Sequence, residues 1–202
     1  MIDLQNKLTI NFYTRDVHTV AKELLGKFFV RIRNKKTMIG KIVEVEAYDG
    51  RVDKAAHTFN GKTKRNEIMF EGGGNLYVYF TYGMHFCANV VTGKINEGTA
   101  VLLRAMEPME GIDQLAINRF NKKDISEKQK INLANGPGKI CQAFHIERID
   151  NKTPLTGNKI FILDSPKLKA DQISTSVRIG IKKSVDLPWR YYIKNNRYIS
   201  KK

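Results

Sequence analysis

Cysteine is scarce in this chain, and its scarcity excludes two classes of protein. The 202 residues include only two cysteines, Cys87 and Cys141. Two thiols are too few for a thiolate zinc site, and too few for the disulfide framework that stabilises many small secreted domains. We therefore expect a reducing, intracellular environment.

Long apolar runs are also missing. No run approaches the ~18 residues that a membrane-spanning helix needs. The first residues, Met1 to Lys7, lack the apolar core of a signal peptide. We expect no membrane partner.

Acidic residues are outnumbered by basic ones, which indicates a polyanionic partner. Lys and Arg total 35 against 20 Asp and Glu, which gives a formal net charge of +15 and a pI near 9.8. Such a balance is typical of proteins that bind nucleic acid or an anionic membrane surface, and the missing membrane span favours nucleic acid.

An apolar content of 42% indicates a folded globular chain. We find no repeat or linker, and expect a single domain over residues 1–202.

The apolar pattern predicts more strands than helices. A first helix follows Thr14 or Asp16 and ends at Gly26. A second is opened by Pro108 and Gly111, and a short one follows Gly136-Pro137-Gly138. The predicted strands are 27–32, 38–47 (joined to the first by a polar loop, 34–37), 76–82, 84–92, 100–106, 159–163, 177–181 and 191–193.

An acid-rich stretch in the second predicted strand has two interpretations. Alternation places Val43, Val45 and Ala47 on one face and Glu44, Glu46 and Tyr48 on the other. The stretch is either a half-buried strand with a wet polar face or the site of a general base, since a positioned carboxylate takes a proton from water. On this stretch alone the first interpretation is favoured. However, a carboxylate near a surface that binds a polyanion needs a reason to be there.

Other features carry charge or aromatic rings at unusual places. Arg104 is the one charge in an apolar strand, so it should meet a carboxylate or a phosphate. A Tyr beside a glycine turn, Tyr82-Gly83-Met84, could push a flat ring into a base stack. The loop residues Lys62, Lys64 and Arg65 are either solvated or in contact with phosphate. The N–H groups after Gly136-Pro137, at Gly138 and Lys139, are either a plain helix start or a phosphate contact.

Five motifs, taken in order and spacing, resemble the 3-methyladenine (alkyladenine) DNA glycosylases. They are Glu44-Val45-Glu46-Ala47-Tyr48, Ala55-Ala56-His57, Leu76 to Tyr79 with Tyr82 to Asn89, Leu102 to Pro108, and Gly136-Pro137-Gly138-Lys139; Arg178-Ile179-Gly180 and Pro188 to Tyr192 continue the match. No single motif is decisive, but the ordered set is very specific. The chain lacks the N-terminal extension of mammalian members and resembles a bacterial one, with His85 where mammalian members have Tyr.

The resemblance implies a role for each matched residue. Glu46 would be the general base and Arg104 would hold it together with a water and a phosphate. Tyr48, His57 and Tyr79 would form the base pocket, and Asn89 would exclude the 2-amino group of guanine. Tyr82 would fill the gap left by the flipped base, with Met84 and His85 beside it. Glu44 would support the site or be solvated. No metal, no cofactor and no lysine nucleophile are implied.

The resemblance also implies a fold and a partner. The fold would be α+β, a curved, mostly antiparallel sheet surrounded by helices. The partner would be double-stranded DNA containing damaged purines, bound by a monomer in the bacterial cytoplasm. Two alternatives remain, a non-catalytic basic nucleic-acid-binding module and a helix-hairpin-helix glycosylase suggested by residues 133–138.

Overall fold

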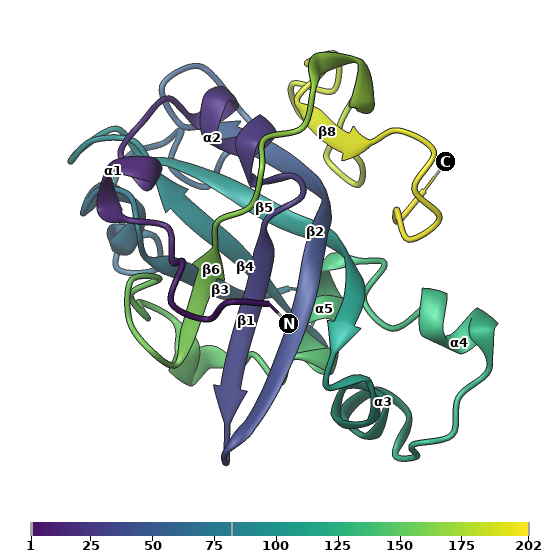
Figure 1. Ribbon diagram of the computed structural model, residues 1–202. Helices are drawn as coiled ribbons and strands as arrows, with labels where there is room; N and C mark the ends of the chain where they lie inside the picture. The colour runs from purple at the N-terminus through teal and green to yellow at the C-terminus, as the bar shows by residue number, and fades with distance from the viewer. Residues whose placement is uncertain (1, 82, 202) are drawn as a thin grey trace.

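One twisted, antiparallel eight-stranded sheet forms the centre of the computed structural model, which describes residues 2–81 and 83–201 (Figure 1). Its main path runs β3-β4-β5-β2-β1-β6, while β8 pairs with β2 and β7 pairs with β8. The strands are β1 (Phe28–Arg33), β2 (Lys36–Asp49), β3 (Leu76–Thr81), β4 (His85–Thr92), β5 (Thr99–Glu110), β6 (Ile160–Leu163), β7 (Ile173–Ser176) and β8 (Arg190–Ile193).

Strand β2 is the strand around which the sheet is organised. A two-residue turn, Asn34-Lys35, joins it to β1, and both turn residues have positive φ, as such tight hairpins require. The first part of β2 pairs with β1, and residues 44–46 pair with β8. On its other side β2 pairs with β5 over nearly its whole length. Residues 44–46 therefore have a strand on each side.

The β2–β5 pairing is irregular where it passes the acid-rich stretch. Its register shifts between Ile42 and Glu44 and again between Glu44 and Val45. Val45 and Ala47 pack in the main core as predicted, but Val43 packs in a separate cluster with Ala105 and Tyr198. The prediction that all three share a face was wrong for Val43, because such an irregularity interrupts the strict alternation of a strand.

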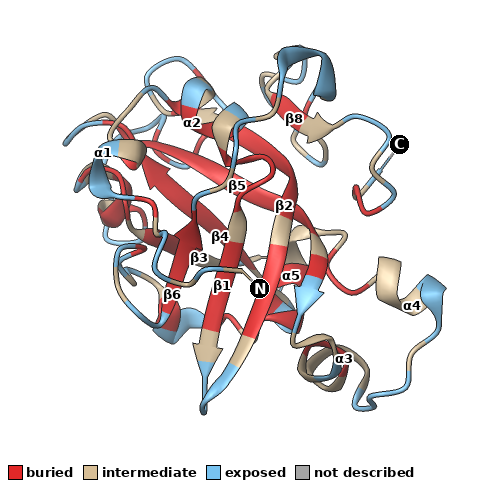
Figure 2. Cartoon of the chain, viewed as in Figure 1, coloured by how far each residue is buried: buried red, intermediate tan, exposed pale blue. Residues whose placement is uncertain are grey.

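The helices are α1 (Ile10–Tyr13), α2 (Val17–Leu24), α3 (Ile112–Phe120), α4 (Glu127–Ile131) and α5 (Pro137–Ala143), with 3-10 turns at Glu67–Phe70, Arg148–Asp150 and Ala170–Gln172. Helices α1 and α2 lie toward one end of the sheet and α3 and α4 toward the other (Figure 1). Helix α2 packs against β2 and β5, and α5 packs against β4 and β5. Figure 2 shows the strands buried along most of their length, whereas α4 and the loops stay exposed.

The predicted elements agree with the structure where local signals are strong. The Asp16 side chain accepts a hydrogen bond from the Thr19 N–H at the start of α2, and Pro137 begins α5 as expected. Two predictions were wrong. Pro108 belongs to β5, so α3 begins only after Gly111. Residues 177–181 form no strand, because the Ile179 main chain binds the buried side chains of Glu46 and Arg104, and Arg178 donates to the Ala47 carbonyl.

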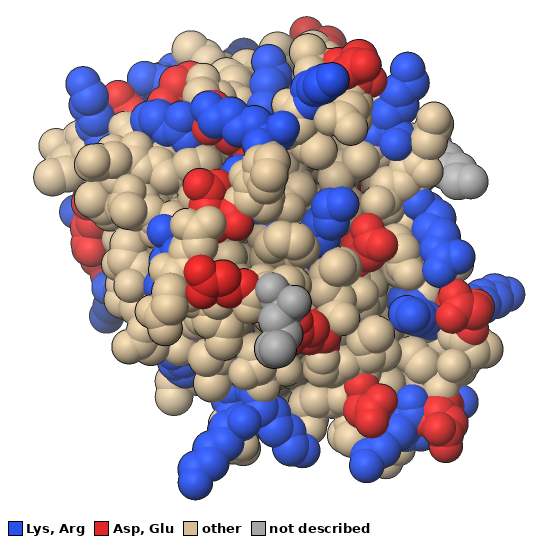
Figure 3. Space-filling view, in the orientation of Figure 1, with Lys and Arg blue, Asp and Glu red and all other residues tan. Residues whose placement is uncertain are grey.

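The fold class is α+β with a curled antiparallel sheet, as predicted. In the part of the chain that the structure describes, no helix has both the length and the apolar character to cross a membrane. Figure 3 shows basic side chains across the top and bottom of one face, with acidic side chains among them. On this face, therefore, the positive excess does not gather into one patch.

Candidate active site

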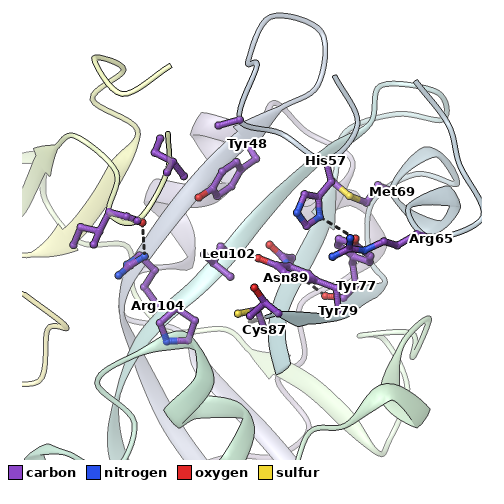
Figure 4. Close-up of a pocket in the computed structure, with 16 residues that line it drawn as sticks. Tyr48, His57, Arg65, Met69, Tyr77, Tyr79, Cys87, Asn89, Leu102 and Arg104 are labelled. Atoms are coloured by element: carbon purple, nitrogen blue, oxygen red, sulfur yellow. Dashed lines mark hydrogen bonds between the residues drawn. The ribbon is translucent and has the colours of Figure 1, made fainter. Parts of the chain in front are cut away.

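A cavity of about 370 Å³ opens where β2, β3, β4 and β5 meet the loops after β2 and before β8. Figure 4 shows Tyr48 and Arg104 on one side of it and His57, Tyr77 and Tyr79 on the other. The cavity thus collects side chains that are far apart in the sequence. Six of the fourteen predicted site residues line it, namely Tyr48, His57, Arg65, Tyr79, Asn89 and Arg104, whereas Glu46 does not.

Aromatic rings form one wall. Alternation along β3 places Tyr77 and Tyr79 on the same face, and their rings stack with centroids 5.4 Å apart at an interplanar angle of 29°. The His57 ring meets Tyr79 edge-on at 4.5 Å. This geometry presents flat π-surfaces to the cavity, as a purine site requires.

His57 is held as a neutral ring. Its Nδ1 lies 3.0 Å from the Tyr77 hydroxyl. Burial lowers the pKa of His57 below its usual value, and the positive charge of Arg65 lowers it further. An imidazole with a lowered pKa is uncharged at neutral pH, which argues against a protonated His57 as the proton donor in a reaction there.

Asn89 lies opposite Tyr77 in the β3–β4 pairing and lines the cavity. Its amide N–H donates to the Tyr77 carbonyl at 3.2 Å. The side chain is buried and its orientation is fixed by this bond. It therefore presents a rigid polar group to whatever enters the cavity.

Glu46 is fully buried, accepts two hydrogen bonds and forms an ion pair with Arg104. Its Oε1 accepts from the Ile179 N–H at 2.8 Å and lies 3.2 Å from Arg104 Nη1, while its Oε2 accepts from the Tyr48 hydroxyl at 2.8 Å. Both oxygens of Glu46 thus have fixed partners, and two of these partners, Tyr48 and Arg104, line the cavity.

The Tyr48 phenol keeps the proton that it donates to this carboxylate. Burial raises the pKa of the Tyr48 phenol, and the negative charge of Glu46 raises it further. The phenol keeps its proton at any physiological pH. It therefore continues to donate to Glu46 while its ring lines the cavity.

Glu44 is buried rather than solvated, which corrects one of the two readings offered above. Its Oε1 accepts from Arg104 Nε at 3.1 Å and from Arg190 Nε at 2.7 Å, and the Ser200 hydroxyl donates to the same oxygen at 2.7 Å. Glu44 does not line the cavity. The wet polar face considered for this strand is likewise wrong, since Glu44 and Glu46 are both fully buried.

Arg104 joins the two carboxylates. It meets Glu44 through Nε and Glu46 through Nη1, which confirms that this mid-strand charge has carboxylate partners. A buried charge is tolerated when it is paired and hydrogen-bonded. Arg104 also lines the cavity, so one side chain links the buried carboxylates to the space above them.

The predicted wedge lies at the β3–β4 turn. Tyr82 falls outside the described residues. Met84 is 68% exposed at the turn. His85 packs on α5 so closely that a Cβ at Gly138 would lie 3.2 Å from the His85 Cβ.

The predicted DNA-backbone residues have different surroundings. Lys62 and Lys64 are exposed on their loop. Arg65 instead lines the cavity, with its guanidinium 5.5 Å from the Tyr79 ring centroid. Lys139 Nζ donates to Asn132 and Asn135 at 2.7 Å each, so neutral amides are its partners there.

Sequence reasoning assigned no role to several residues that build the site. Asp53 and Arg178 form a fully buried ion pair, and Arg190 and Ser200 hold Glu44. Asp53 follows the acid-rich stretch by a few residues, and both arginines lie in matched motifs. No local pattern, however, indicates a contact between residues more than 120 positions apart.

Two comparisons relate the chain to known proteins. A model of the family described as "Methylpurine-DNA glycosylase (MPG)" matches residues 11–197. A Clostridium botulinum protein named "Putative 3-methyladenine DNA glycosylase" is 46% identical, covering 96% of this chain and 99% of that protein. A protein of the same name from Carboxydothermus hydrogenoformans is 50% identical, covering 95% of this chain and 97% of that protein. Another from Clostridium novyi is 46% identical, covering 97% of this chain and 99% of that protein.

The class defined by this fold and these comparisons is that of DNA glycosylases. Within it, the chain belongs to the methylpurine-DNA glycosylase family.

Proposed function

We propose that this protein flips alkylated and deaminated purines out of double-stranded DNA and hydrolyses their N-glycosidic bonds. The proposed substrates are 3-methyladenine, 7-methylguanine, hypoxanthine and ethenoadenine. The observation that carries the proposal is the buried Glu46 carboxylate, held by Tyr48, Ile179 and Arg104, of which Tyr48 and Arg104 line the aromatic cavity.

The aromatic cavity supports the substrate class. A flipped purine would stack between the rings of Tyr48 on one side and His57 and Tyr79 on the other. Alkylated purines are cationic, and a cation over an aromatic face gains about 0.5–2 kcal/mol. The fixed amide of Asn89 would meet the 2-amino group of a normal guanine and exclude it.

For a purine that is already cationic, the reaction needs only a base and a water; a neutral purine such as hypoxanthine also needs a proton, because it would otherwise leave as an anion. Glu46 takes a proton from the water, whose oxygen forms a bond to C1′ as the C1′–N bond breaks and its electron pair leaves with the purine. Arg104 keeps Glu46 and the water in register. The products are the free base and an abasic site. Since no lysine acts as nucleophile, the strand stays intact and the enzyme is monofunctional.

DNA contacts complete the proposal. Tyr82 would fill the vacated space in the stack, with Met84 and His85 beside it. Phosphates would meet the basic loop and the start of α5, at Lys62, Lys64, Arg65, Gly138 and Lys139. We propose that the protein acts as a monomer on bacterial chromosomal DNA in the cytoplasm, without metal or cofactor, and as one domain over residues 1–202.

The two alternatives explain less. A helix-hairpin-helix glycosylase is all-helical around its motif, whereas residues 133–138 here lie beside an eight-stranded sheet. A non-catalytic binding module would explain the charge of +15. It would not explain why two fully buried carboxylates converge on one arginine. Burying these charges costs desolvation free energy, and binding to DNA does not require it.

Excision from a defined duplex tests the proposal. A duplex with one hypoxanthine or one alkylated adenine is incubated with the protein and then heated in alkali, which breaks the strand at an abasic site. We expect a new break at the lesion. Glu46→Gln should lower single-turnover excision by a factor of ~10² or more while binding to damaged DNA remains.

The matched control is Glu107→Gln, the same change on β5 at a half-buried acid away from the cavity. It should leave excision near normal. Binding without any break in the wild-type protein would favour the binding module. Near-normal excision by Glu46→Gln would remove Glu46 from the role of base.

A further inference from the structure

Arg178 lies behind the wall of the cavity, against Tyr48. Its guanidinium carbon is 4.6 Å from the Tyr48 ring centroid and 5.2 Å from that of Trp189, so the cation lies between two rings. Its side chain is fully buried and does not line the cavity, whereas Tyr48 does. Tyr48 therefore has a cation on the face turned away from the cavity.

Asp53 neutralises that cation. Its carboxylate binds both terminal nitrogens of Arg178, with Nη2 to Oδ1 at 2.9 Å, and its side chain is also fully buried. Bidentate pairing of this kind fixes direction as well as charge. The Asp53–Arg178 pair presents the rear of Tyr48 with a dipole rather than a net charge.

The same pair reaches three parts of the site. Arg178 donates to the Ala47 carbonyl on β2, and its neighbour Ile179 donates to Glu46. Asp53 accepts from the Ala55 N–H, which orders the loop that carries His57. A pair placed this way could serve as a structural support alone.

Its charges also act on the substrate through Tyr48. A cationic purine on the cavity face and Arg178 on the rear face would repel each other across one ring. The purine and the guanidinium would be separated by two stacking distances. At that separation in a partly buried site, their repulsion changes the binding constant of the purine by roughly tenfold. A neutral purine such as hypoxanthine is insensitive to it at that level.

We propose that the Asp53–Arg178 pair sets the selectivity of the pocket between cationic and neutral purines. Asp53 holds the rear of Tyr48 electrically neutral and so keeps its cavity face attractive to cationic bases. Arg178 gives the ring its orientation. This inference rests on the proposed function, in which Tyr48 stacks on the flipped base.

The measured quantity is the ratio of kcat/KM for 7-methylguanine to kcat/KM for hypoxanthine, in otherwise identical duplexes. Asp53→Asn leaves the charge of Arg178 uncompensated, and we expect the ratio to fall roughly tenfold. Arg178→Gln leaves the charge of Asp53 uncompensated, and we expect the ratio to rise. If the pair had a purely structural role, each variant would lower kcat/KM for both substrates together. The ratio would then not move in opposite directions in the two variants.

The control is Asp150→Asn, which breaks another buried bidentate pair, with Arg31, away from the cavity. It should lower stability without changing the ratio. The double variant Asp53→Asn with Arg178→Gln removes both charges, so it is the one to use if either single variant does not fold. Its ratio should stay within about threefold of the wild-type ratio.

A ratio unchanged in both folded single variants, or a tenfold change in the double variant, would overturn the inference. Failure of the wild-type protein to excise either base is a different result. It would overturn the proposed function instead.

Discussion

Glu44 and Glu46 are both fully buried two residues apart in β2, and their partners separate their roles. Glu46 is bound by a phenol, a main-chain N–H and one arginine, and the phenol and the arginine line the cavity. Glu44 is bound by two arginines and by Ser200, which leaves a reacting water little access. Identity alone could not distinguish them, because both fit the same alternating pattern. The resemblance selected Glu46, and that assignment stays a prediction.

His57 offers a pH test at the same scale. The pKa of His57 is lowered by burial and then by Arg65, so the ring is neutral above pH 6.5 and gains charge only below that value. A protonated His57 would repel a cationic purine. We expect single-turnover excision of 7-methylguanine to fall as pH drops below 6.5, and that of hypoxanthine to fall less.

Two variants identify the group responsible. Arg65→Gln removes the charge that lowers the His57 pKa, so the fall should move to higher pH, while Arg65→Lys should leave it in place. His57→Gln should abolish this part of the profile. A fall that persists unchanged in His57→Gln belongs to another group.

At the scale of elements, strands with strong alternation and clear turns could be predicted, and segments held by side chains could not. The β1–β2 and β3–β4 hairpins follow from their apolar patterns, from the polar loop 34–37 and from the glycine at Gly83. The apolar residues Val177, Ile179 and Ile181 also alternate, yet no strand forms there. Ile179 uses its N–H for Glu46 and its carbonyl for Arg104, which removes it from any ladder. Local pattern carries no information about such distant partners.

The segment after β8 supports the site from the C-terminal side. The Ser200 hydroxyl donates to Glu44 and lies 3.3 Å from Arg104 Nη2, while the Lys201 carbonyl accepts from Arg190. Ser200→Ala should lower the free energy of unfolding by about 1–3 kcal/mol, because a buried carboxylate loses a donor. It should also lower excision, since Arg104 loses a contact. Urea denaturation and single-turnover excision measure the two effects.

Lys201→Ala is the control for that segment. Lys201 makes its contact to Arg190 through the main chain, so removing its side chain leaves the contact in place. Both stability and excision should stay near wild-type values. An equal loss in the two variants would mean that the segment acts only as a covering layer.

For the whole molecule, composition predicted the class of partner but not where it binds. The excess of basic residues indicates nucleic acid, yet basic and acidic side chains are mixed on the face in Figure 3. The site itself is assembled from β2 through to Ser200, nearly the whole chain, because β2 pairs with β5 and β8 at once. The acid-rich stretch and the tyrosines could be singled out in advance. Their convergence on one cavity depended on pairing across the sheet.

Salt dependence measures how much of the charge is used. Each phosphate neutralised by Lys or Arg releases counterions, so the logarithm of the binding constant falls with the logarithm of salt concentration by about 0.9 per contact. Binding of the Glu46→Gln variant to damaged duplex can be followed without turnover. If Lys62 and Lys64 contact phosphates, Lys62→Gln and Lys64→Gln should each reduce the slope by about one.

The control is Lys35→Gln, because Lys35 lies at the turn before β2, at the opposite end of that 14-residue strand from Tyr48. A slope that changes for Lys35 and not for the two loop lysines would place the DNA on another face of the protein.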